Sequence, residues 1–316
     1  MFKAYYNFER FKYIHKEIVS RGDYETHNGE LIPKTACFLS EDLNVFIDTS
    51  DGINEDLAIQ EYCARILSCV TFSNGKKFLY FKAAYSPQWS SNIVKIAEEN
   101  NGKVIPLFKW SFNGSFYKNV FGNEQLINEK FSDVKKEYDI GYFCNLEPYT
   151  YPKPSAKNPL ISWSDHKKFD LPGESKNMGH YLNNSRELLY NRVQDSSFKV
   201  LHRDKMNYYD YIRESYKCKV ILNPPGVGEY TSRMFDQSYL GNCVVLRKSS
   251  YDNGISWKNH LPEVDFNSKN WQSDMKNIVD NYQEYGKKCK DYFDSSWSAE
   301  AIVNYLDENI KNYNPE

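Results

Sequence analysis

The sequence predicts an α/β protein with two sheet domains, because strand and helix patterns alternate in two successive runs along its 316 residues. Short runs of β-branched and aromatic residues indicate strands, and apolar residues recur at helical spacing between them. A chain of this length also has room for two domains. We expect a first domain over 1–137, a second over 138–297 and a last helix within 298–316.

The first half shows strand and helix patterns in regular alternation. The expected strands lie at 37–39, 45–47, 77–81 and 103–108. The expected helices lie at 56–69 and 92–99. Because parallel strands need a long connection between them, usually a helix, this order predicts a parallel sheet.

The second half repeats the alternation, and a long polar, proline-rich segment follows its first strand. The expected strands lie at 138–144, 197–201, 220–222 and 243–246. The expected helices lie at 184–195, 207–217, 271–286 and 298–312. This order is again typical of an α/β domain.

The stretch 219–246 carries the clearest functional signal of the chain. A short strand is broken by the turn at 223–228, whose glycines allow the backbone to turn tightly and to approach a ligand. Thr231 or Ser232 is suited to cap the helix that follows, and Gly241 is suited to end it. Such a unit places free N–H groups and the positive end of a helix dipole at the carboxyl edge of a sheet. The sequence therefore predicts an anion site here.

Two side chains make this anion site more specific. Arg233 falls in the first helical turn, where the helix dipole disfavours a cation unless an anion lies opposite. Asp236 follows three residues later and shares a helix face with Arg233. A guanidinium can hold a phosphate with two hydrogen bonds, and a carboxylate can accept hydrogen bonds from ribose hydroxyls. The pair therefore indicates a nucleoside diphosphate; the alternative is an ordinary surface ion pair beside a structural turn.

The order of strand, G-x-G, T-S-R-x-x-D, Gly and strand resembles the donor-binding motif of GT-B glycosyltransferases, most of all their exostosin-like and viral or phage branches. The resemblance is specific over 208–250, weaker over 138–207 and absent before 138. It implies the GT-B fold, in which two Rossmann-like domains face a central cleft. It also implies that the first domain binds the acceptor, that the second binds the nucleotide sugar, and that the last helix returns toward the first domain.

By this resemblance, the Gly-rich turn and the first helical turn hold the diphosphate and sugar of a nucleotide sugar, with UDP as the expected nucleotide. Asp236 takes the place of an acidic residue that holds the ribose, although many relatives carry the longer Glu there. The candidate donor-binding residues are Asn145, His202, Arg203, Gly226, Gly228, Glu229, Tyr230, Thr231, Ser232, Arg233 and Asp236. For Asn145, His202 and Arg203, which end expected strands, an ordinary role in a turn or loop is the alternative.

Catalysis is assigned to Arg233 and Asp51. Arg233 would stabilise the leaving diphosphate, so no metal and no other cofactor is expected to be essential. Asp51 follows the strand at 45–47 and would act as general base on the acceptor hydroxyl, in preference to Asp48. The spacing D-x-x-D differs from the D-x-D with which a GT-A transferase, the rival enzyme class, holds a metal. Helix capping and a turn are the structural alternative for both acids.

Composition limits the partners and the location. The formal net charge of −2 provides no overall positive field for a nucleic acid. The seven cysteines form no C-x-x-C pair, which favours reduced thiols and a cytoplasmic location, that of the host if the protein is viral. The N-terminal residues are too polar for a signal peptide, and no apolar run approaches the roughly 18 residues of a membrane span.

The acceptor is left open between two classes. A composition rich in Asn, Lys, Tyr and Ile suggests an AT-rich genome such as that of a phage, and phages carry GT-B enzymes that modify hydroxymethylated bases in DNA. A surface or viral glycan is the alternative acceptor. A third interpretation, a non-catalytic nucleotide- or sugar-binding module, predicts binding without turnover.

Overall fold

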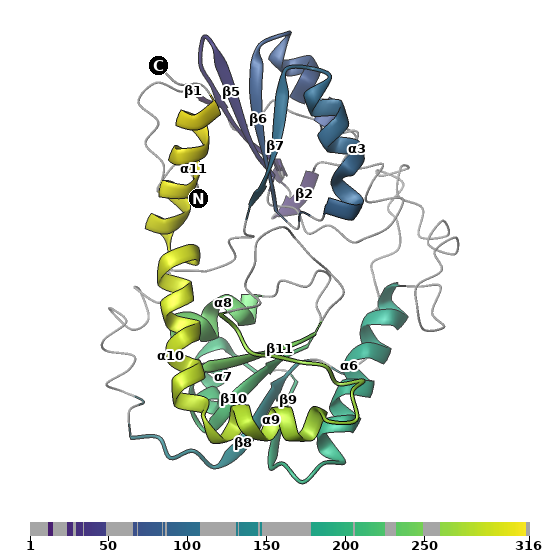
Figure 1. The fold of residues 1–316 in the computed structure, drawn as a ribbon, viewed down its shortest axis with the longest axis vertical. Coiled ribbons are helices and arrows are strands. Elements are labelled where there is room, and N and C mark those ends of the chain that lie inside the picture. Colours follow the sequence, from purple (N-terminus) through teal and green to yellow (C-terminus); the bar gives the residue numbers. More distant parts are fainter. Residues whose placement is uncertain are drawn as a thin grey trace.

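The computed structural model of the chain defines the fold over the residues that it describes. These are residues 12–14, 24–27, 30–33, 35–48, 66–67, 69–83, 85, 87–107, 131, 133–144, 146, 178–204, 206–224, 232–248 and 260–313. Their strands form two five-stranded sheets and a separate two-stranded sheet. Figure 1 shows the two larger sheets at opposite ends of the molecule, with α10 (Tyr282–Tyr292) and α11 (Ala299–Tyr313) along one side.

The first sheet has the strand order β1-β4-β5-β6-β7. Its strands are β1 (Lys12–Ile14), β4 (Thr35–Leu39), β5 (Leu43–Asp48), β6 (Lys77–Ala83) and β7 (Gly102–Leu107). β5, β6 and β7 are parallel, whereas β4 pairs antiparallel with both β1 and β5. The separate sheet is an antiparallel pair of β2 (Tyr24–His27) and β3 (Glu30–Pro33).

The predicted parallel sheet is present in β5, β6 and β7, but the strand at 37–39 is antiparallel to β5. Only three residues, Ser40 to Asp42, separate β4 from β5, and a parallel pair needs a crossover of a dozen or more residues. The Ser40 hydroxyl donates to the Leu43 carbonyl at 2.6 Å and accepts from the Leu43 N–H at 3.0 Å, which closes a tight turn. β4 therefore returns as the antiparallel neighbour of β5.

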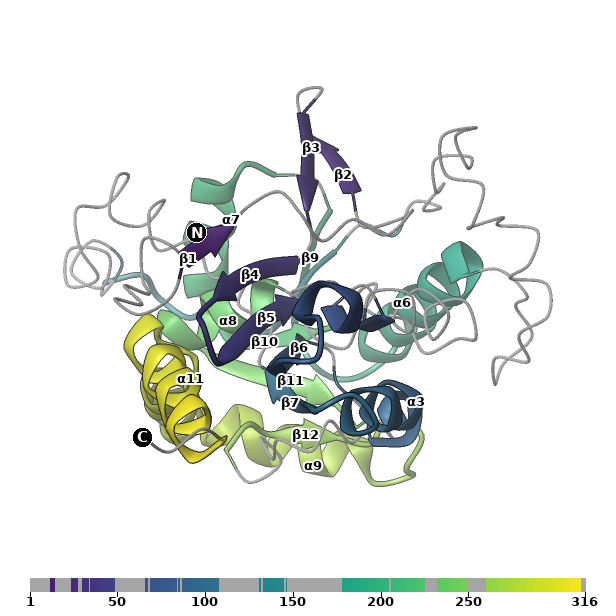
Figure 2. The ribbon, with the colours of Figure 1, turned by 90° about the horizontal axis from the view of Figure 1, so that it is seen from above.

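Helices cover both faces of the first sheet. One face packs against α3 (Pro87–Glu98), and the buried residues of this contact are Phe46, Phe78, Tyr80, Ile93, Ala97 and Val104. The other face packs against α11, which contributes Ile302, Leu306 and Ile310. Figure 2 shows α3 and α11 on opposite sides of this sheet. The last helix of the described chain is therefore part of the core of the first sheet.

Hydrogen bonds also tie α11 to β7. The Tyr305 hydroxyl donates to the Pro106 carbonyl at 2.7 Å, and the Tyr313 hydroxyl donates to the Asn101 carbonyl at 2.9 Å. The ring of Tyr305 meets the ring of Phe81 edge-on, with centroids 6.4 Å apart. These contacts fix both the position of α11 along the sheet and its rotation about its own axis.

The second sheet has the strand order β12-β11-β10-β8-β9, and all its pairings are parallel. Its strands are β8 (Tyr138–Phe143), β9 (Val200–Arg203), β10 (Cys218–Asn223), β11 (Cys243–Arg247) and β12 (Glu263–Val264). The chain adds β9 on one side of β8 and then β10 to β12 on the other side. The strand order therefore reverses between β8 and β10, which makes this place a topological switch point.

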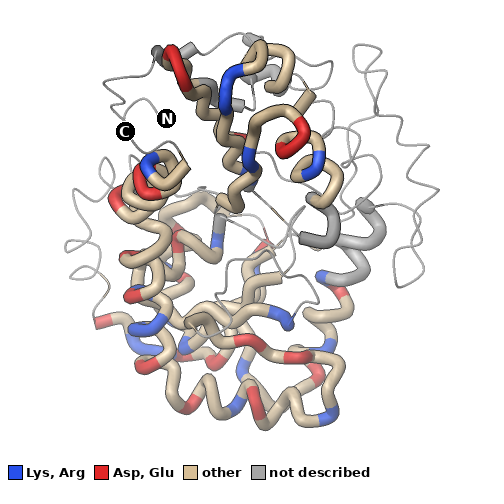
Figure 3. Tube along the Cα trace, turned by 45° about the horizontal axis from the view of Figure 1, so that its top comes forward, with Lys and Arg blue, Asp and Glu red and all other residues tan. Residues whose placement is uncertain are grey.

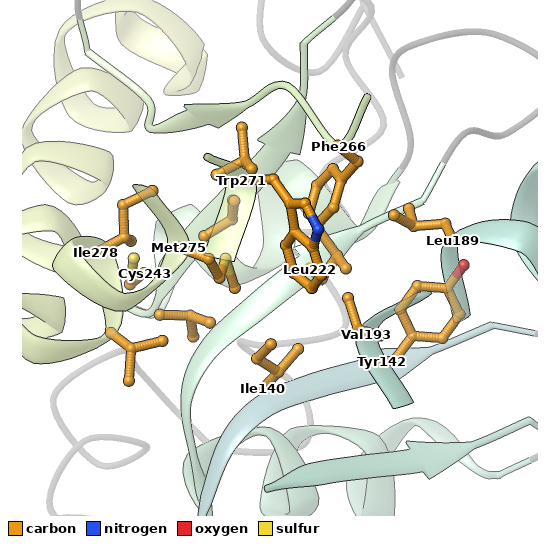
Figure 4. Packing of buried hydrophobic residues seen from close by; sticks show 14 of the residues in the cluster. Ile140, Tyr142, Leu189, Val193, Leu222, Cys243, Phe266, Trp271, Met275 and Ile278 are labelled. Carbon is orange, nitrogen blue, oxygen red and sulfur yellow. The ribbon is translucent and has the colours of Figure 1, made fainter. Parts of the chain in front are cut away.

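Helices also cover both faces of the second sheet. α6 (Met178–Gln194) and α9 (Trp271–Asp280) lie on one face, where Figure 4 shows Trp271, Met275 and Val193 gathered around Leu222 of β10. The other face packs against α7 (Tyr208–Tyr216) and α8 (Ser232–Tyr239). Parallel strands covered by helices on both faces explain why the strands read as continuous apolar runs.

A π-helix over Phe293–Trp297 joins α10 of the second sheet to α11 of the first. Trp297 is fully buried in this connection. Its ring lies 4.6 Å from that of Phe235 in α8 and 4.9 Å from that of Tyr292, measured between centroids. The connection between the two sheets is therefore packed directly against the helix that follows the Gly-rich turn.

The prediction of one helix over 271–286 is wrong, because α9 ends at Asp280 and α10 starts at Tyr282. Between them, Asn281 has φ −112° and ψ 25°, outside the helical region. Its side chain donates to the Asn277 carbonyl at 2.8 Å, the kind of local hydrogen bond with which Asn competes against a regular helix.

The predicted fold class is confirmed. The chain is an α/β protein with two Rossmann-like units, each built on parallel strands and covered by helices. None of the helices within the described residues combines the length and the apolar character that crossing a membrane requires.

Gly286 of α10 lies against the backbone that follows α8, and this contact can be tested. A Cβ on Gly286 would lie 2.5 Å from the Gly241 carbonyl oxygen and 3.3 Å from the Cys243 nitrogen. Neither atom belongs to a flexible side chain, so α10 would have to move. We expect Gly286→Ala to lower the free energy of unfolding by about 1–3 kcal/mol in urea denaturation, although Ala favours a helix by roughly 1 kcal/mol.

The control for this variant is Lys287→Ala, because Lys287 is exposed on the same helix. It should change the free energy of unfolding by no more than about 0.5 kcal/mol. A Gly286→Ala protein as stable as the wild type would show that α10 does not need the close approach.

Candidate functional site

Topology alone places a ligand site at the carboxyl edge of the second sheet. In open α/β sheets, ligands bind outside the carboxyl ends of the strands where the strand order reverses, and here that point lies between β8 and β10. The next described helices are α6 after β8 and α8 after β10, and these two helices cover opposite faces of the sheet. Figure 1 shows α8 on the side of the second sheet that is nearer to the first.

Packing and a glycine fix the position of α8. Its Met234 and Phe235 are each 1% exposed and pack against β11 and the Trp297 ring. The helix ends at Tyr239, and Gly241, two residues later, has a φ of +73° in the left-handed region, as expected of a glycine that terminates a helix. Because α8 begins at Ser232, directly after the Gly-rich segment, the positive end of its dipole lies at the carboxyl edge of the sheet.

Arg233, in the first turn of α8, acts through its charge on groups at the end of β8. Burial raises the pKa of the Cys144 thiol, and the positive charges of Arg233 and Arg186 oppose this rise. Burial also raises the pKa of the Tyr142 phenol, where the same two arginines again act in the opposite direction. Because Tyr142 and Cys144 lie at the end of β8, the charge of Arg233 acts across the switch point.

Arg186 of α6 is a residue that sequence reasoning missed. The Tyr142 hydroxyl donates to the backbone carbonyl of Arg186 at 2.8 Å, which fastens α6 to β8 at this residue. The charges of two guanidinium groups, carried by helices on opposite faces, therefore act on one strand end. Both charges would attract an anion at this strand end, and the fork geometry of arginine suits a phosphate. No local motif surrounds Arg186, so only its place in the fold reveals it.

Arg247 is a second missed cation at the same edge. It is the last residue of β11, the neighbour of β10, and its Nε is buried with no hydrogen-bond partner among the described residues. A buried donor without an acceptor costs about 1–3 kcal/mol. An acceptor oxygen from a ligand would recover this free energy.

Asp236 lies one helical turn beyond Arg233 and is 3% exposed. This burial is incompatible with the alternative of an ordinary exposed ion pair. Burial raises the pKa of the Tyr211 phenol; the charge of Asp236 adds to the rise and that of Arg233 opposes it. Tyr211 of α7 also packs edge-on against Phe143 at the end of β8, with ring centroids 5.6 Å apart. Tyr211 therefore packs beside the switch point, where the charges of Arg233 and Asp236 act on it, and no motif in the sequence indicates Tyr211.

The structure separates the two candidates at the end of β9. His202 is half-buried, and its Nε2 lies 3.1 Å from the Cys144 carbonyl, so it sits next to the end of β8. Its ring is 4.6 Å from that of Tyr190 in α6, measured between centroids. Arg203 is exposed, and its Nη1 donates to the His202 carbonyl at 2.9 Å. His202 thus lies beside the end of β8, on which the charges of Arg233 and Arg186 act, whereas Arg203 contacts its own strand.

Several candidates lie outside the described residues, and their roles stay predictions. They are Asp51, Asn145, Gly226, Gly228, Glu229, Tyr230 and Thr231. Ser232 is the first residue of α8, and only its backbone is described. Asp48, the weaker choice for a general base, is the last residue of β5 and is fully buried beside Lys82.

The described side chains show whether a metal site or a disulfide bond is present among them. Among the described residues, His, Cys, Asp and Glu form no group of three or more that could hold a metal ion. Cys69, Cys144, Cys218, Cys243 and Cys289 are buried and form no disulfide bond.

No protein-family model matches the chain, and no curated protein sequence is similar to it. Among solved structures, the chain is similar to sucrose-phosphate synthase from Thermosynechococcus elongatus, with 10% identity, a TM-score of 0.43, and coverage of 85% of this chain and 67% of that one. It is also similar to MurG from Acinetobacter baumannii, with 10% identity, a TM-score of 0.33, and coverage of 83% and 84%. At these identities and TM-scores the similarity is limited to the general arrangement of the backbone.

A joint role of Arg186 and Arg233 in binding an anion can be tested with pyrophosphate in the presence of EDTA. Each guanidinium would contribute charge-assisted hydrogen bonds worth about 1.5–3 kcal/mol. We therefore expect Arg186→Ala and Arg233→Ala each to weaken pyrophosphate binding at least about tenfold in isothermal titration calorimetry. Arg192→Ala is the matched control, because Arg192 lies on α6 but over the Trp271 ring, away from the edge. Equal affinity in all three variants would remove both arginines from the anion site.

Proposed function

We propose that this protein is a glycosyltransferase that takes its sugar from a nucleoside diphosphate sugar, with UDP as the nucleotide. The observation that carries the proposal is the place of α8, whose N-terminus lies at the carboxyl edge beside the switch point, together with the charges of Arg233 and Arg186 that act on the end of β8. Two arginines and a helix N-terminus can together hold the two phosphates of such a donor. The resemblance of the segment 208–250 to GT-B donor motifs supports the same assignment.

The arrangement suits departure of a diphosphate. In the proposed reaction the acceptor oxygen forms a bond to the anomeric carbon, and the bond from that carbon to the diphosphate breaks. The electron pair leaves with the diphosphate, where Arg233 and Arg186 offset the developing negative charge. The acceptor proton passes to a general base, for which Asp51 is our proposal. Asp236, one turn along α8, is proposed to accept the ribose hydroxyls.

The acceptor belongs to one of two proposed classes, a hydroxymethylated pyrimidine in DNA or a glycan. Figure 3 shows Lys and Arg interspersed with Asp and Glu over the described helices and strands. The described elements therefore present charges of both signs, which, like the net charge of −2, gives a DNA acceptor no electrostatic support. Incubation of the protein and a UDP-sugar with hydroxymethylated DNA or with oligosaccharides, followed by measurement of sugar transfer, compares the two acceptor classes directly.

The first experiment is a thermal-shift panel in EDTA with UDP, GDP, ADP, CMP and several UDP-sugars, repeated with Mn²⁺. A ligand at one hundred times its dissociation constant stabilises the native state by about 2.7 kcal/mol, which raises the melting temperature measurably. We expect UDP and at least one UDP-sugar to produce this shift in EDTA. No shift with any nucleotide would contradict the proposal, and a shift only with Mn²⁺ would favour the metal-dependent class.

Turnover separates an enzyme from a binding module. We expect slow release of UDP from the UDP-sugar that stabilises the protein most, with water as the acceptor. Binding without any release of UDP, with or without DNA and oligosaccharides, would favour the non-catalytic module.

The ribose assignment predicts a specific effect for Asp236→Asn. The amide loses the negative charge that a pair of hydroxyls favours, so the donor KM should rise about tenfold, as for loss of a hydrogen bond to a charged group, with less effect on kcat. Circular dichroism should show an unchanged fold. Asp274→Asn, at an exposed position of α9, is the control and should leave donor KM unchanged. An unchanged donor KM in the Asp236 variant would exclude the ribose contact.

A further inference from the structure

Two buried polar atoms between α7 and α8 have no hydrogen-bond partner among the described residues. They are Oη of Tyr211 in α7 and Nε2 of Gln237 in α8. Gln237 is 0% exposed, and its Oε1 accepts from Nδ2 of Asn242 at 2.7 Å, so only one end of its amide is satisfied. Because a buried polar atom without a partner is costly, a ligand that completes these hydrogen bonds is favoured here.

These two side chains lie beside the residues of the proposed donor site. Burial raises the pKa of the Tyr211 phenol; the charge of Arg233 opposes this rise and that of Asp236 adds to it. The Gln237 side chain, a hydrogen-bond donor near the phenol, also opposes the rise. The Tyr211 ring packs edge-on against that of Phe143, which places the phenol at the carboxyl end of β8.

Helical spacing puts the polar residues of α8 on one side of the helix. Asp236 and Gln237 follow Arg233 by three and four residues, the spacings at which side chains share a helix face. Leu240 continues this side and packs with Ile212 of α7. The contact between α7 and α8 is therefore apolar at one end and polar at the end that starts from the carboxyl edge of the sheet.

The hydrogen-bonding capacity of this group suits hydroxyls. The carboxylate of Asp236 can only accept, whereas the Gln237 amide N–H and the Tyr211 hydroxyl can donate. A phosphate oxygen would use the donors alone. A hydroxyl uses both kinds of group, because it donates its proton and its oxygen still accepts.

We propose that Tyr211 and Gln237 complete a site for the two ribose hydroxyls of the donor nucleotide, in which they donate to the hydroxyl oxygens whose protons Asp236 accepts. This inference rests on the proposed function and extends it from Asp236 to two further residues. A site built to hydrogen-bond a hydroxyl rejects an analogue that lacks it, because the buried donors are then left unpaired. The donor is therefore a ribonucleotide with both hydroxyls free.

The test is a cycle of Tyr211→Phe against nucleotides that lack one hydroxyl, measured by isothermal titration calorimetry in EDTA. We expect the wild type to bind UDP about tenfold more tightly than 2′-deoxy-UDP or 3′-deoxy-UDP, the scale of a hydrogen bond lost in a buried site. Tyr211→Phe should weaken UDP binding by a similar factor. It should weaken binding of at least one deoxy analogue much less, because the two deletions remove the same contact.

The melting temperature without nucleotide gives a second readout. Tyr211→Phe should leave it unchanged or raise it, because the hydroxyl has no partner to lose. The matched control is Tyr305→Phe, which removes the hydroxyl of another half-buried tyrosine, one that donates to the Pro106 carbonyl at 2.7 Å. The control should lower the melting temperature and leave all nucleotide affinities unchanged, since Tyr305 packs on the first sheet.

Gln237→Glu tests the second donor. It keeps an oxygen that accepts from Asn242 and replaces the unpartnered N–H with an oxygen that cannot donate when ionised. UDP affinity should fall more than the affinity for the more weakly bound deoxy analogue. Circular dichroism should show an unchanged fold.

The outcomes separate this inference from the proposed function. Wild-type UDP affinity in both variants, or equal binding of UDP and both deoxy analogues by the wild type, would overturn the ribose site and leave the glycosyltransferase proposal standing. An equal loss of affinity for all three nucleotides in Tyr211→Phe would also overturn it, because the phenol would then contact the diphosphate. Absence of any nucleotide binding by the wild type would overturn the proposed function and this inference with it.

Discussion

Parallel pairing of β8 with β10 is the constraint on which the second unit and its site depend. Parallel neighbours must be joined by crossovers, so each helix that follows a strand starts again from the carboxyl edge. Since β9 lies outside β8, the next described helices after β8 and β10, α6 and α8, cover opposite faces. Arg186 of α6 and Arg233 of α8 therefore act through their charges on the end of β8 from the two sides of the sheet. The charge arrangement is thus a product of topology rather than of a local motif.

Sequence patterns predict the helices and strands correctly where the local preferences of the residues agree with the tertiary packing. The strand, helix, Gly241 end and second strand of 219–246 are all present, because the left-handed φ of Gly241 and the apolar side of α8 are encoded within a few residues. The fold class followed from the same alternation. Arg233 was singled out correctly as a residue of the first helical turn.

Features that depend on distant partners could not be predicted in this way. Arg186 meets β8 through Tyr142, 44 residues away in the chain, and nothing near Arg186 marks it. The direction of β4 depends on a three-residue turn. Strand β9 starts at Val200 rather than at the predicted residue 197, because the Ser196 hydroxyl accepts a hydrogen bond from the Phe198 N–H. The burial of Asp236 and of Asp48 likewise follows from packing between elements.

The position of helix α11 at the end of the described chain affects how the first unit folds while the protein is being synthesised. During synthesis the strands of the first sheet leave the ribosome long before residues 299–313, yet Ile302, Leu306 and Ile310 complete one of its two hydrophobic faces. Among the described residues no other helix packs on that face, so this cover is missing while the whole second unit is translated. The first unit therefore cannot finish folding as an independent nascent domain, and its half-covered sheet is the intermediate most exposed to aggregation or chaperone binding.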